Sequence, residues 1–156
     1  KAVPDFLMSG NYTPYKTIQT ISNAMDVGDP SNIKRIMDLY NNFESIAEDI
    51  YSWSYSDDET RKTISNVYSK YKYLLDPHSA VGYLGIDNYV RKDKNCEGLF
   101  LGTAHPCKFS DIIELATNKA IEMPNRIKSL LGKEKKSILL NNKYDEFSDY
   151  LLSNFE

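Results

Sequence analysis

The side chains best suited to chemistry lie in two short motifs, each of which follows an apolar run. Residues 76–79 read Asp-Pro-His-Ser, and residues 102–106 read Gly-Thr-Ala-His-Pro. An apolar run that stops abruptly in small, polar or proline residues is typical of a strand that ends at the ligand-binding edge of an α/β sheet. We therefore expect the two motifs to lie at one shared site.

Each motif contains one of the two histidines of the chain, His78 and His105. Imidazole titrates near neutral pH, so either side chain could act as a general acid or base. Hydrogen bonding to nearby backbone groups is the commoner role of such a histidine, and both interpretations stay open. A metal site is not expected, because Cys96, His105 and Cys107 lack the paired spacing of a four-ligand site.

A third group of polar side chains, Asn23, Asp26 and Asn32, surrounds a turn that contains glycine and proline. The turn could present these side chains and a helix N-terminus to an anionic ligand, although a purely structural turn explains the same residues. Asp76 is similarly ambiguous. Its carboxylate could face a substrate at the mouth of a cleft, or it could cap the helix that follows.

Helices must carry most of these motifs, because apolar residues recur at helical spacing along much of the chain. Asp29 followed by Pro30 predicts the start of one long amphipathic helix that reaches residue 50. Ser56 and Glu59 have the spacing of a capping box, which predicts the start of a second helix. Further helices are expected over residues 79–90, 110–120 and 123–132, and from about residue 144 onward.

Three short segments, residues 17–22, 73–75 and 99–101, have the apolar character of strands. Residues 1–16 suggest irregular backbone at an edge or linker. Strands separated by helices are typical of parallel pairing in a layered fold. The expected fold class is therefore α/β, helix-rich with a thin, mainly parallel sheet. So few strands would leave that sheet incomplete on its own.

The composition is that of an ordinary globular protein. A chain of 156 residues, 41% hydrophobic and 26% charged, should form a single domain over residues 1–156. A net charge of −3 offers no basic footprint for nucleic acid or anionic lipid. No apolar run approaches bilayer-spanning length, and two cysteines are too few for a disulfide framework. We expect a soluble, cytoplasmic protein that binds neither membranes nor nucleic acid.

Residues 76–83, residues 98–109 and the segment from Thr20 to Asn32 together resemble the last third of the threonine synthase family, in the longer form found in many bacteria and fungi. The resemblance covers essentially the whole chain. It implies the layered fold of the pyridoxal 5'-phosphate enzymes of the tryptophan synthase β type, of which this chain would be a C-terminal fragment. The first residue, Lys1 rather than Met, agrees with that expectation.

The same resemblance implies that the intact parent converts O-phospho-L-homoserine and water to L-threonine and phosphate. Thr103 would then hydrogen-bond the pyridine nitrogen of the cofactor. Because a hydroxyl cannot hold a proton on that nitrogen as a carboxylate would, the ring should stay largely neutral. The resemblance also suggests, less strongly than for Thr103, that four residues lie near the substrate: Asn23, Asp26, Asp76 and His105.

The chain itself should hold no catalytic residue. In this family the lysine that binds the cofactor lies in a Phe-Lys-Asp context, and that tripeptide is absent from this sequence. A glycine-rich loop for the cofactor phosphate is absent from the sequence too. We therefore expect an inactive fragment whose main partner is the missing N-terminal part of the same polypeptide.

Two other interpretations stay open. A serine or threonine dehydratase of the same fold would also place a hydroxyl at the pyridine nitrogen, although we associate the Thr-Ala-His-Pro run with threonine synthase. The second interpretation is a free-standing helical interaction module, in which the 12 tyrosines of the chain could form a binding surface.

Overall fold

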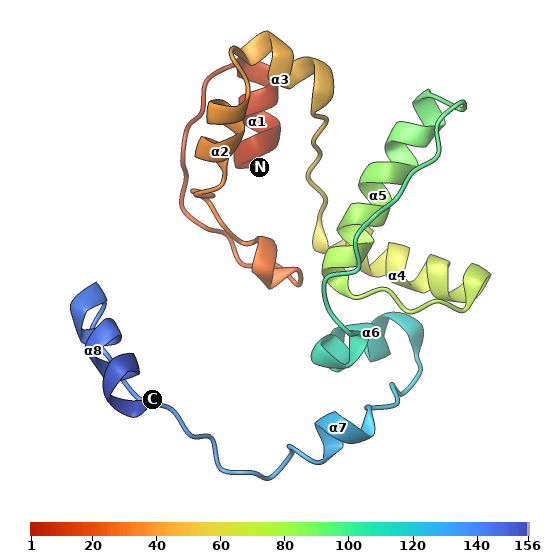
Figure 1. Cartoon of the computed structure of the whole chain (residues 1–156). Helices are drawn as coiled ribbons and strands as arrows, with labels where there is room; N and C mark the ends of the chain where they lie inside the picture. The colour runs from red at the N-terminus through yellow and green to blue at the C-terminus, as the bar shows by residue number, and fades with distance from the viewer. Residues whose placement is uncertain (156) are drawn as a thin grey trace. The chain divides into compact units, whose positions relative to one another are not determined.

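The computed structural model describes residues 1–155, which form α-helices, two short 3₁₀ helices and connecting segments (Figure 1). The chain divides into two compact units, Lys1–Glu122 and a second unit from Met123 onward. The elements of the first unit are α1 (Ala2–Ser9), η1 (Asn23–Met25), α2 (Ile33–Leu39), α3 (Phe43–Asp49), α4 (Asp57–Tyr71), α5 (Pro77–Lys92), η2 (Pro106–Phe109) and α6 (Ser110–Thr117). Those of the second are α7 (Asn125–Lys128) and α8 (Tyr144–Asn154).

Helix α1 corrects the prediction of irregular backbone over residues 1–16. Pro4 lies in the first turn of this helix, where backbone N–H groups have no partner inside the helix, so the proline removes no hydrogen bond. Gly10 ends the helix with φ at 71° and donates its N–H to the carbonyl of Phe6 at 2.8 Å. Phe6 itself is buried in the first of two apolar cores.

The single long helix predicted up to residue 50 is instead two helices, α2 and α3. Asn42 has extended backbone (φ −156°, ψ 170°), and its side-chain oxygen accepts the N–H of Ser45 at 2.9 Å. Asn42 thus caps α3 and breaks the helix, although the apolar spacing continues across the break. The first core consists of Phe6, Ile33 and Ile46.

The second core forms where α4, α5 and α6 meet, and it fixes the position of the candidate site. The predicted capping box at the start of α4 is confirmed, because the Ser56 hydroxyl accepts the N–H of Glu59 and the Glu59 carboxylate accepts the N–H of Ser56. Helix α6 ends earlier than predicted, since Asn118 turns into the left-handed region with φ at 52°. The second core consists of Ile64, Val67, Leu75, Ala80 and Ile113.

None of the three predicted strands is present within residues 1–155. Residues 99–101, for example, form a connecting segment in which Leu99 and Leu101 are 95% and 83% exposed. A strand requires hydrogen bonds to a neighbouring extended segment, and no backbone hydrogen bond joins residues 97–104 to another part of the described chain. The helix-rich character is confirmed, whereas the layered sheet stays a prediction.

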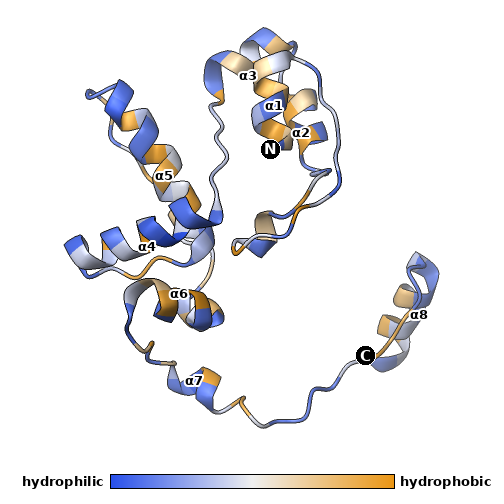
Figure 2. Cartoon of the chain, turned by 180° about the vertical axis from the view of Figure 1, so that it is seen from behind, coloured by the Kyte–Doolittle hydropathy of each residue, from blue (hydrophilic) through white to orange (hydrophobic). Residues whose placement is uncertain are grey.

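Neither core includes a residue from the range 123–155. The helices α7 and α8 of the second unit bury no residue, and α8 carries hydrophobic and hydrophilic residues along its length (Figure 2).

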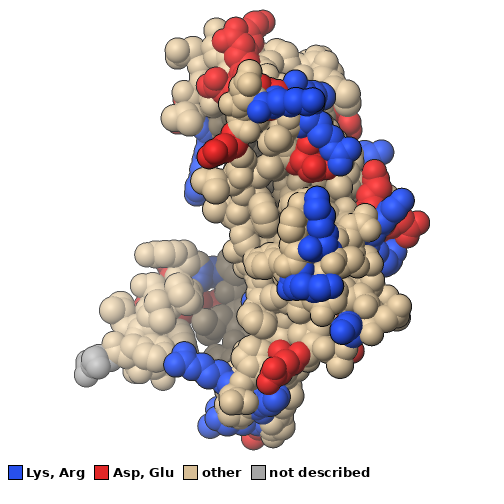
Figure 3. Space-filling view, turned by 90° about the vertical axis from the view of Figure 1, so that its right-hand side faces the viewer, with Lys and Arg blue, Asp and Glu red and all other residues tan. Residues whose placement is uncertain are grey.

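On the face shown in Figure 3, basic and acidic side chains are interspersed. Among residues 1–155, no helix combines the length and apolar character needed to cross a membrane.

Candidate functional site

The carboxylate of Asp76, directly before α5, is the centre of a buried hydrogen-bond cluster. Its Oδ1 atom accepts the backbone N–H of His78 at 3.0 Å and lies 2.9 Å from Nδ1 of the same residue. The Oδ2 atom accepts the hydroxyl of Ser79. Only 1% of Asp76 is exposed. The carboxylate therefore caps α5, the second of the two roles that the sequence allowed, and its proximity to a substrate stays a prediction.

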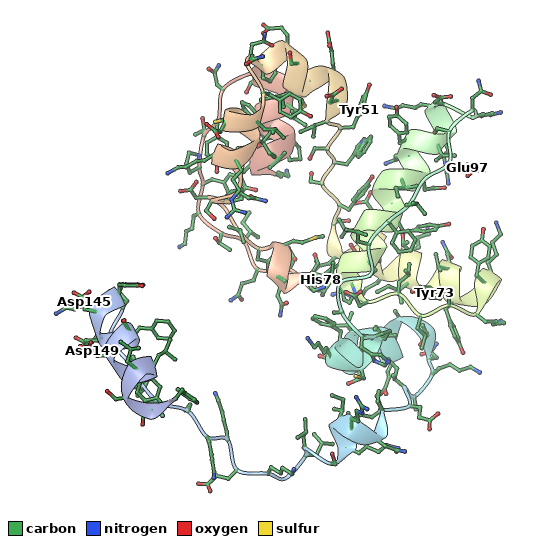
Figure 4. The ribbon with its side chains drawn as sticks, in the orientation of Figure 1. Tyr51, Tyr73, His78, Glu97, Asp145 and Asp149 are labelled. Atoms are coloured by element: carbon green, nitrogen blue, oxygen red, sulfur yellow. The ribbon has the colours of Figure 1, made fainter. Side chains whose placement is uncertain are left out.

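His78, in the first turn of α5, links this cluster to residues 20–28, which we call the 20–28 turn (Figure 4). The Nε2 atom of His78 accepts the backbone N–H of Ala24 at 3.0 Å. Because Nε2 acts as an acceptor, the ring proton is assigned to Nδ1, which then donates a hydrogen bond to Asp76. The ring is 5% exposed and packs on Phe109 of η2, with ring centroids 4.9 Å apart. Hydrogen bonds at both ring nitrogens thus hold His78 as a neutral imidazole.

Asp26 holds the 20–28 turn together. Its carboxylate accepts the N–H of Thr20 at 2.7 Å and the hydroxyl of Thr20 at 2.6 Å. Ile21 donates its N–H to Asp57 in the first turn of α4 at 3.1 Å. Asn23 begins η1, and its side chain is exposed. Asn23 is therefore open to a ligand, whereas Asp26 is already bonded within the turn.

Gly28 closes the turn against the backbone of Tyr15. The N–H of Tyr15 donates to the carbonyl of Gly28 at 3.2 Å. A methyl group on Gly28 would overlap the carbonyl oxygen of Tyr15, so only glycine allows this close approach of two backbones.

Thr103 follows a segment that returns along α5. Phe100 packs beside Gly82 of this helix, and a methyl group on Gly102 would lie 4.0 Å from the hydroxyl oxygen of Ser79. The side chain of Thr103 is exposed and makes no hydrogen bond within residues 1–155. Its hydroxyl is therefore available to a ligand, close to the start of α5.

His105 caps the 3₁₀ helix η2. Its Nδ1 atom accepts the N–H of Cys107 at 3.2 Å, and the side chain is otherwise exposed. This contact is a backbone role similar to that of His78, and a role in proton transfer stays a prediction. Among residues 1–155, no group of three or more His, Cys, Asp or Glu side chains is arranged to hold a metal ion.

The segments that carry the predicted site residues meet at the start of α5. The 20–28 turn reaches it through Ala24, the segment before Thr103 reaches it through Gly102, and η2 reaches it through Phe109. The two chemical motifs therefore lie side by side. Within the described residues, no hydrogen bond joins the side chains of Asn23, Asp26, Thr103 and His105 to one another.

A cavity of about 530 Å³ lies beside the 20–28 turn and includes Asp26 in its wall. Trp53, Tyr55 and Glu59 also line it, and none of the three was predicted from the sequence to be a site residue. Burial raises the pKa of Tyr55, whose hydroxyl oxygen accepts from the amide of Asn88 at 2.5 Å. Trp53 and Tyr55 lie in the connection between α3 and α4, where no motif or periodicity signals a site.

Sequence comparison relates the chain to one family. The family model described as "Threonine synthase, C-terminal" matches residues 79–151. The chain is also 35% identical to the threonine synthase of Buchnera aphidicola subsp. Schizaphis graminum over 150 residues, which cover 96% of this chain and 34% of that protein.

Solved structures agree with the sequence matches. The crystal structure of threonine synthase from Escherichia coli superposes with a TM-score of 0.78 at 29% identity, over 98% of this chain and 35% of that chain. The structure of PLP-bound threonine synthase from Brucella melitensis superposes with a TM-score of 0.75 at 26% identity, over 96% of this chain and 37% of that chain.

The described helices thus have the fold of one portion of a larger class of proteins. That class is the threonine synthases: residues 79–151 match the model of their C-terminal part, and the chain as a whole is similar to threonine synthases in both sequence and fold. It spans about a third of the length of the relatives that it matches.

Proposed function

We propose that this chain is the C-terminal portion of a threonine synthase, which converts O-phospho-L-homoserine and water to L-threonine and phosphate. The observation that carries the proposal is the extent of the match. The likeness covers 96% of the chain in sequence and 98% in fold, while it occupies only about a third of each relative. All the relatives named above are threonine synthases, which favours a synthase over a dehydratase or a free-standing interaction module.

We propose that Thr103 contributes to binding pyridoxal 5'-phosphate, the cofactor named for the Brucella melitensis relative. Its exposed hydroxyl, which has no partner within residues 1–155, fits the role of hydrogen-bond donor to the ring nitrogen. When bound, the cofactor supplies a ring that withdraws negative charge from the reacting carbon. A threonine hydroxyl is too weak an acid to protonate the ring nitrogen, so Thr103 would orient the ring and leave it neutral. We also propose that Asn23, Asp26, Asp76 and His105 lie near the substrate, which rests on the resemblance to threonine synthases rather than on free hydrogen-bonding groups.

The sheet and the cofactor-binding lysine would come from the rest of the polypeptide. Leu99 and Leu101 project into solvent on either side of the half-buried Phe100, and the backbone of residues 97–104 lacks partners in the described chain. An exposed apolar segment with unpaired backbone groups is suited to join a sheet as a strand. We propose that this segment joins the layered, mainly parallel sheet of the complete enzyme.

This part of the protein would work in a reducing cytoplasm, since both cysteines are free.

The test compares Thr103→Val with Thr103→Ser in the complete polypeptide that contains this sequence. The wild type should bind pyridoxal phosphate and release phosphate from O-phospho-L-homoserine. Loss of one hydrogen bond should make Thr103→Val bind the cofactor about five- to tenfold more weakly, whereas Thr103→Ser should retain wild-type affinity. Equal affinity in both variants would remove Thr103 from the site. A wild type without phosphate release would contradict the proposed function itself.

A further inference from the structure

We propose that the neutral imidazole of His78 is a latch that positions the 20–28 turn against the start of α5. The contacts that form the latch all lie within this chain. Its importance for the reaction rests on the proposed function, because the turn carries Asn23 and Asp26 and the start of α5 lies beside the segment that ends in Thr103. His78 would be a positioning residue that need not touch the substrate.

The turn depends on polar contacts for its position. Its helical part, η1, buries no residue, so no apolar side chain anchors η1 to the cores. The bond from Ala24 to His78 joins residues 54 positions apart in the sequence. The bond from Ile21 to Asp57 is the other side-chain hydrogen bond that ties the turn to a distant helix among the described residues. Loss of the His78 acceptor should therefore free the part of the turn that contains Asn23.

The proton on His78 decides whether the latch is closed. Nε2 can accept the N–H of Ala24 only while it carries no proton, and a doubly protonated ring would face one N–H with another. Asp76 holds the other side of the ring and would still accept from Nδ1 in either state. Protonation should therefore release the turn while it leaves the cap of α5 in place.

Among the described residues, the carboxylate of Asp76 is the charged group in contact with the ring. Asp26 in the turn is bonded to Thr20, and Asp57 on α4 is bonded to Ile21. No hydrogen bond or ion pair within residues 1–155 joins His78 to the titratable groups of the 20–28 turn, of the first turn of α4, or of η2 and its cap, which are Asp26, Asp57, Asp58, Glu59, His105, Cys107 and Lys108.

Nuclear magnetic resonance on the full chain tests the latch directly. The ring of His78 and the backbone amide of Ala24 should titrate with the same midpoint, and protonation should lower hydrogen-exchange protection of Ala24 about fivefold or more, as expected for one lost hydrogen bond. The amide of Cys107, which donates to His105, is the internal control and should follow His105 instead. An Ala24 amide that ignores the titration of His78 would overturn the proposal.

Two variants separate the two sides of the ring. In His78→Asn the side-chain amide can still donate to Asp76 but is too short to reach Ala24, so helix content should persist while protection of Ala24 is lost. In His78→Gln the longer side chain can reach Ala24 but not both partners, so protection of Ala24 should be retained better. Wild-type protection of Ala24 in His78→Asn would contradict the latch.

In the complete enzyme, His78→Asn should raise KM for O-phospho-L-homoserine about fivefold while affinity for pyridoxal phosphate stays near the wild-type value, since only the turn is displaced. An unchanged KM together with the expected Ala24 behaviour would leave the latch intact and remove its role in the reaction. Failure of the wild-type enzyme to turn over would instead reject the proposed function, so the two failures are distinguishable.

Discussion

At the scale of single residues, the carboxylate of Asp76 organises the start of α5. It accepts from the backbone and ring of His78 and from the hydroxyl of Ser79, all in a buried position. A buried donor that loses its acceptor costs about 1–3 kcal/mol, because it has given up water without replacement. Asp76 is therefore needed by its neighbours whether or not it lies near a substrate.

Replacement of Asp76 by alanine should destabilise the first unit by about 2–4 kcal/mol, since it removes a helix cap and leaves buried donors without an acceptor. Chemical denaturation followed by circular dichroism measures the change. Asp58→Ala is the matched control, because the Asp58 side chain is 95% exposed and pairs only with Arg61 of its own helix. Equal losses in the two variants would show that the cluster around Asp76 is unimportant for stability.

At the scale of elements, local hydrogen bonds decide where helices start, and packing decides which of them are held. The capping box of Ser56 and Glu59 starts α4, and the first-turn carboxylates suit the positive end of the helix. Helix α6 is short and is held by Ile113, which is fully buried in the second core. These two causes predict different responses to mutation.

Acid should weaken the start of α4. The backbone N–H and the hydroxyl of Ser56 donate to Glu59 and lower the pKa of its carboxyl below the ordinary value of 4.5. A lowered pKa means that the stabilisation is present above pH 4.5 and is lost as the pH falls through the folded-state pKa. Unfolding curves from pH 6 to pH 3 should therefore show less pH dependence in Glu59→Gln than in the wild type.

The control for this experiment is Glu97→Gln, which changes an exposed carboxylate without a hydrogen bond in the described chain. It should keep the pH dependence of the wild type. Identical slopes for the wild type and Glu59→Gln would contradict the contribution of the capping box.

Truncation of Ile113 to alanine should cost about 2–5 kcal/mol of unfolding free energy, because it opens a cavity in the second core. Leu115 lies on the same helix and is 80% exposed, so Leu115→Ala should change stability little. Denaturation midpoints of the two variants provide the measurement. A loss in Leu115→Ala as large as that in Ile113→Ala would mean that α6 is held by another face.

At the scale of the whole molecule, all residues of both cores lie within Lys1–Glu122. The helices α7 and α8 of the second unit bury no side chain in the described chain. The exposed leucines at positions 99 and 101 and the unpaired backbone beside them add a surface that the chain does not cover itself.

A chain that stops after Glu122 should unfold with the same midpoint and cooperativity as the full chain, because it keeps every core residue. Denaturation of both proteins, followed by circular dichroism and by the fluorescence of Trp53, measures this. A clear loss of stability in the shorter chain would favour the single domain over residues 1–156 that the composition suggests.

Sequence alone determined the features that depend on neighbours along the chain. The capping box of Ser56 and Glu59 and the helix α5 depend on contacts within one or two helical turns. The spacing of residues in the sequence reveals such contacts. The relation to threonine synthases was also visible in short motifs and was confirmed by the comparisons. The break at Asn42 was missed, because apolar periodicity reports the buried face and not the hydrogen bond that interrupts it.

Only the tertiary structure showed that Asp76 caps α5, because its burial and the bonds from His78 and Ser79 depend on how α5 packs. It also decided the partner of His78, since Ala24 lies 54 residues away and no local pattern encodes that pairing. The predicted strands are absent from residues 1–155 for the same reason. A strand exists only when a second segment supplies the other half of each hydrogen bond, and that segment is a property of the assembled fold rather than of the residues in the run.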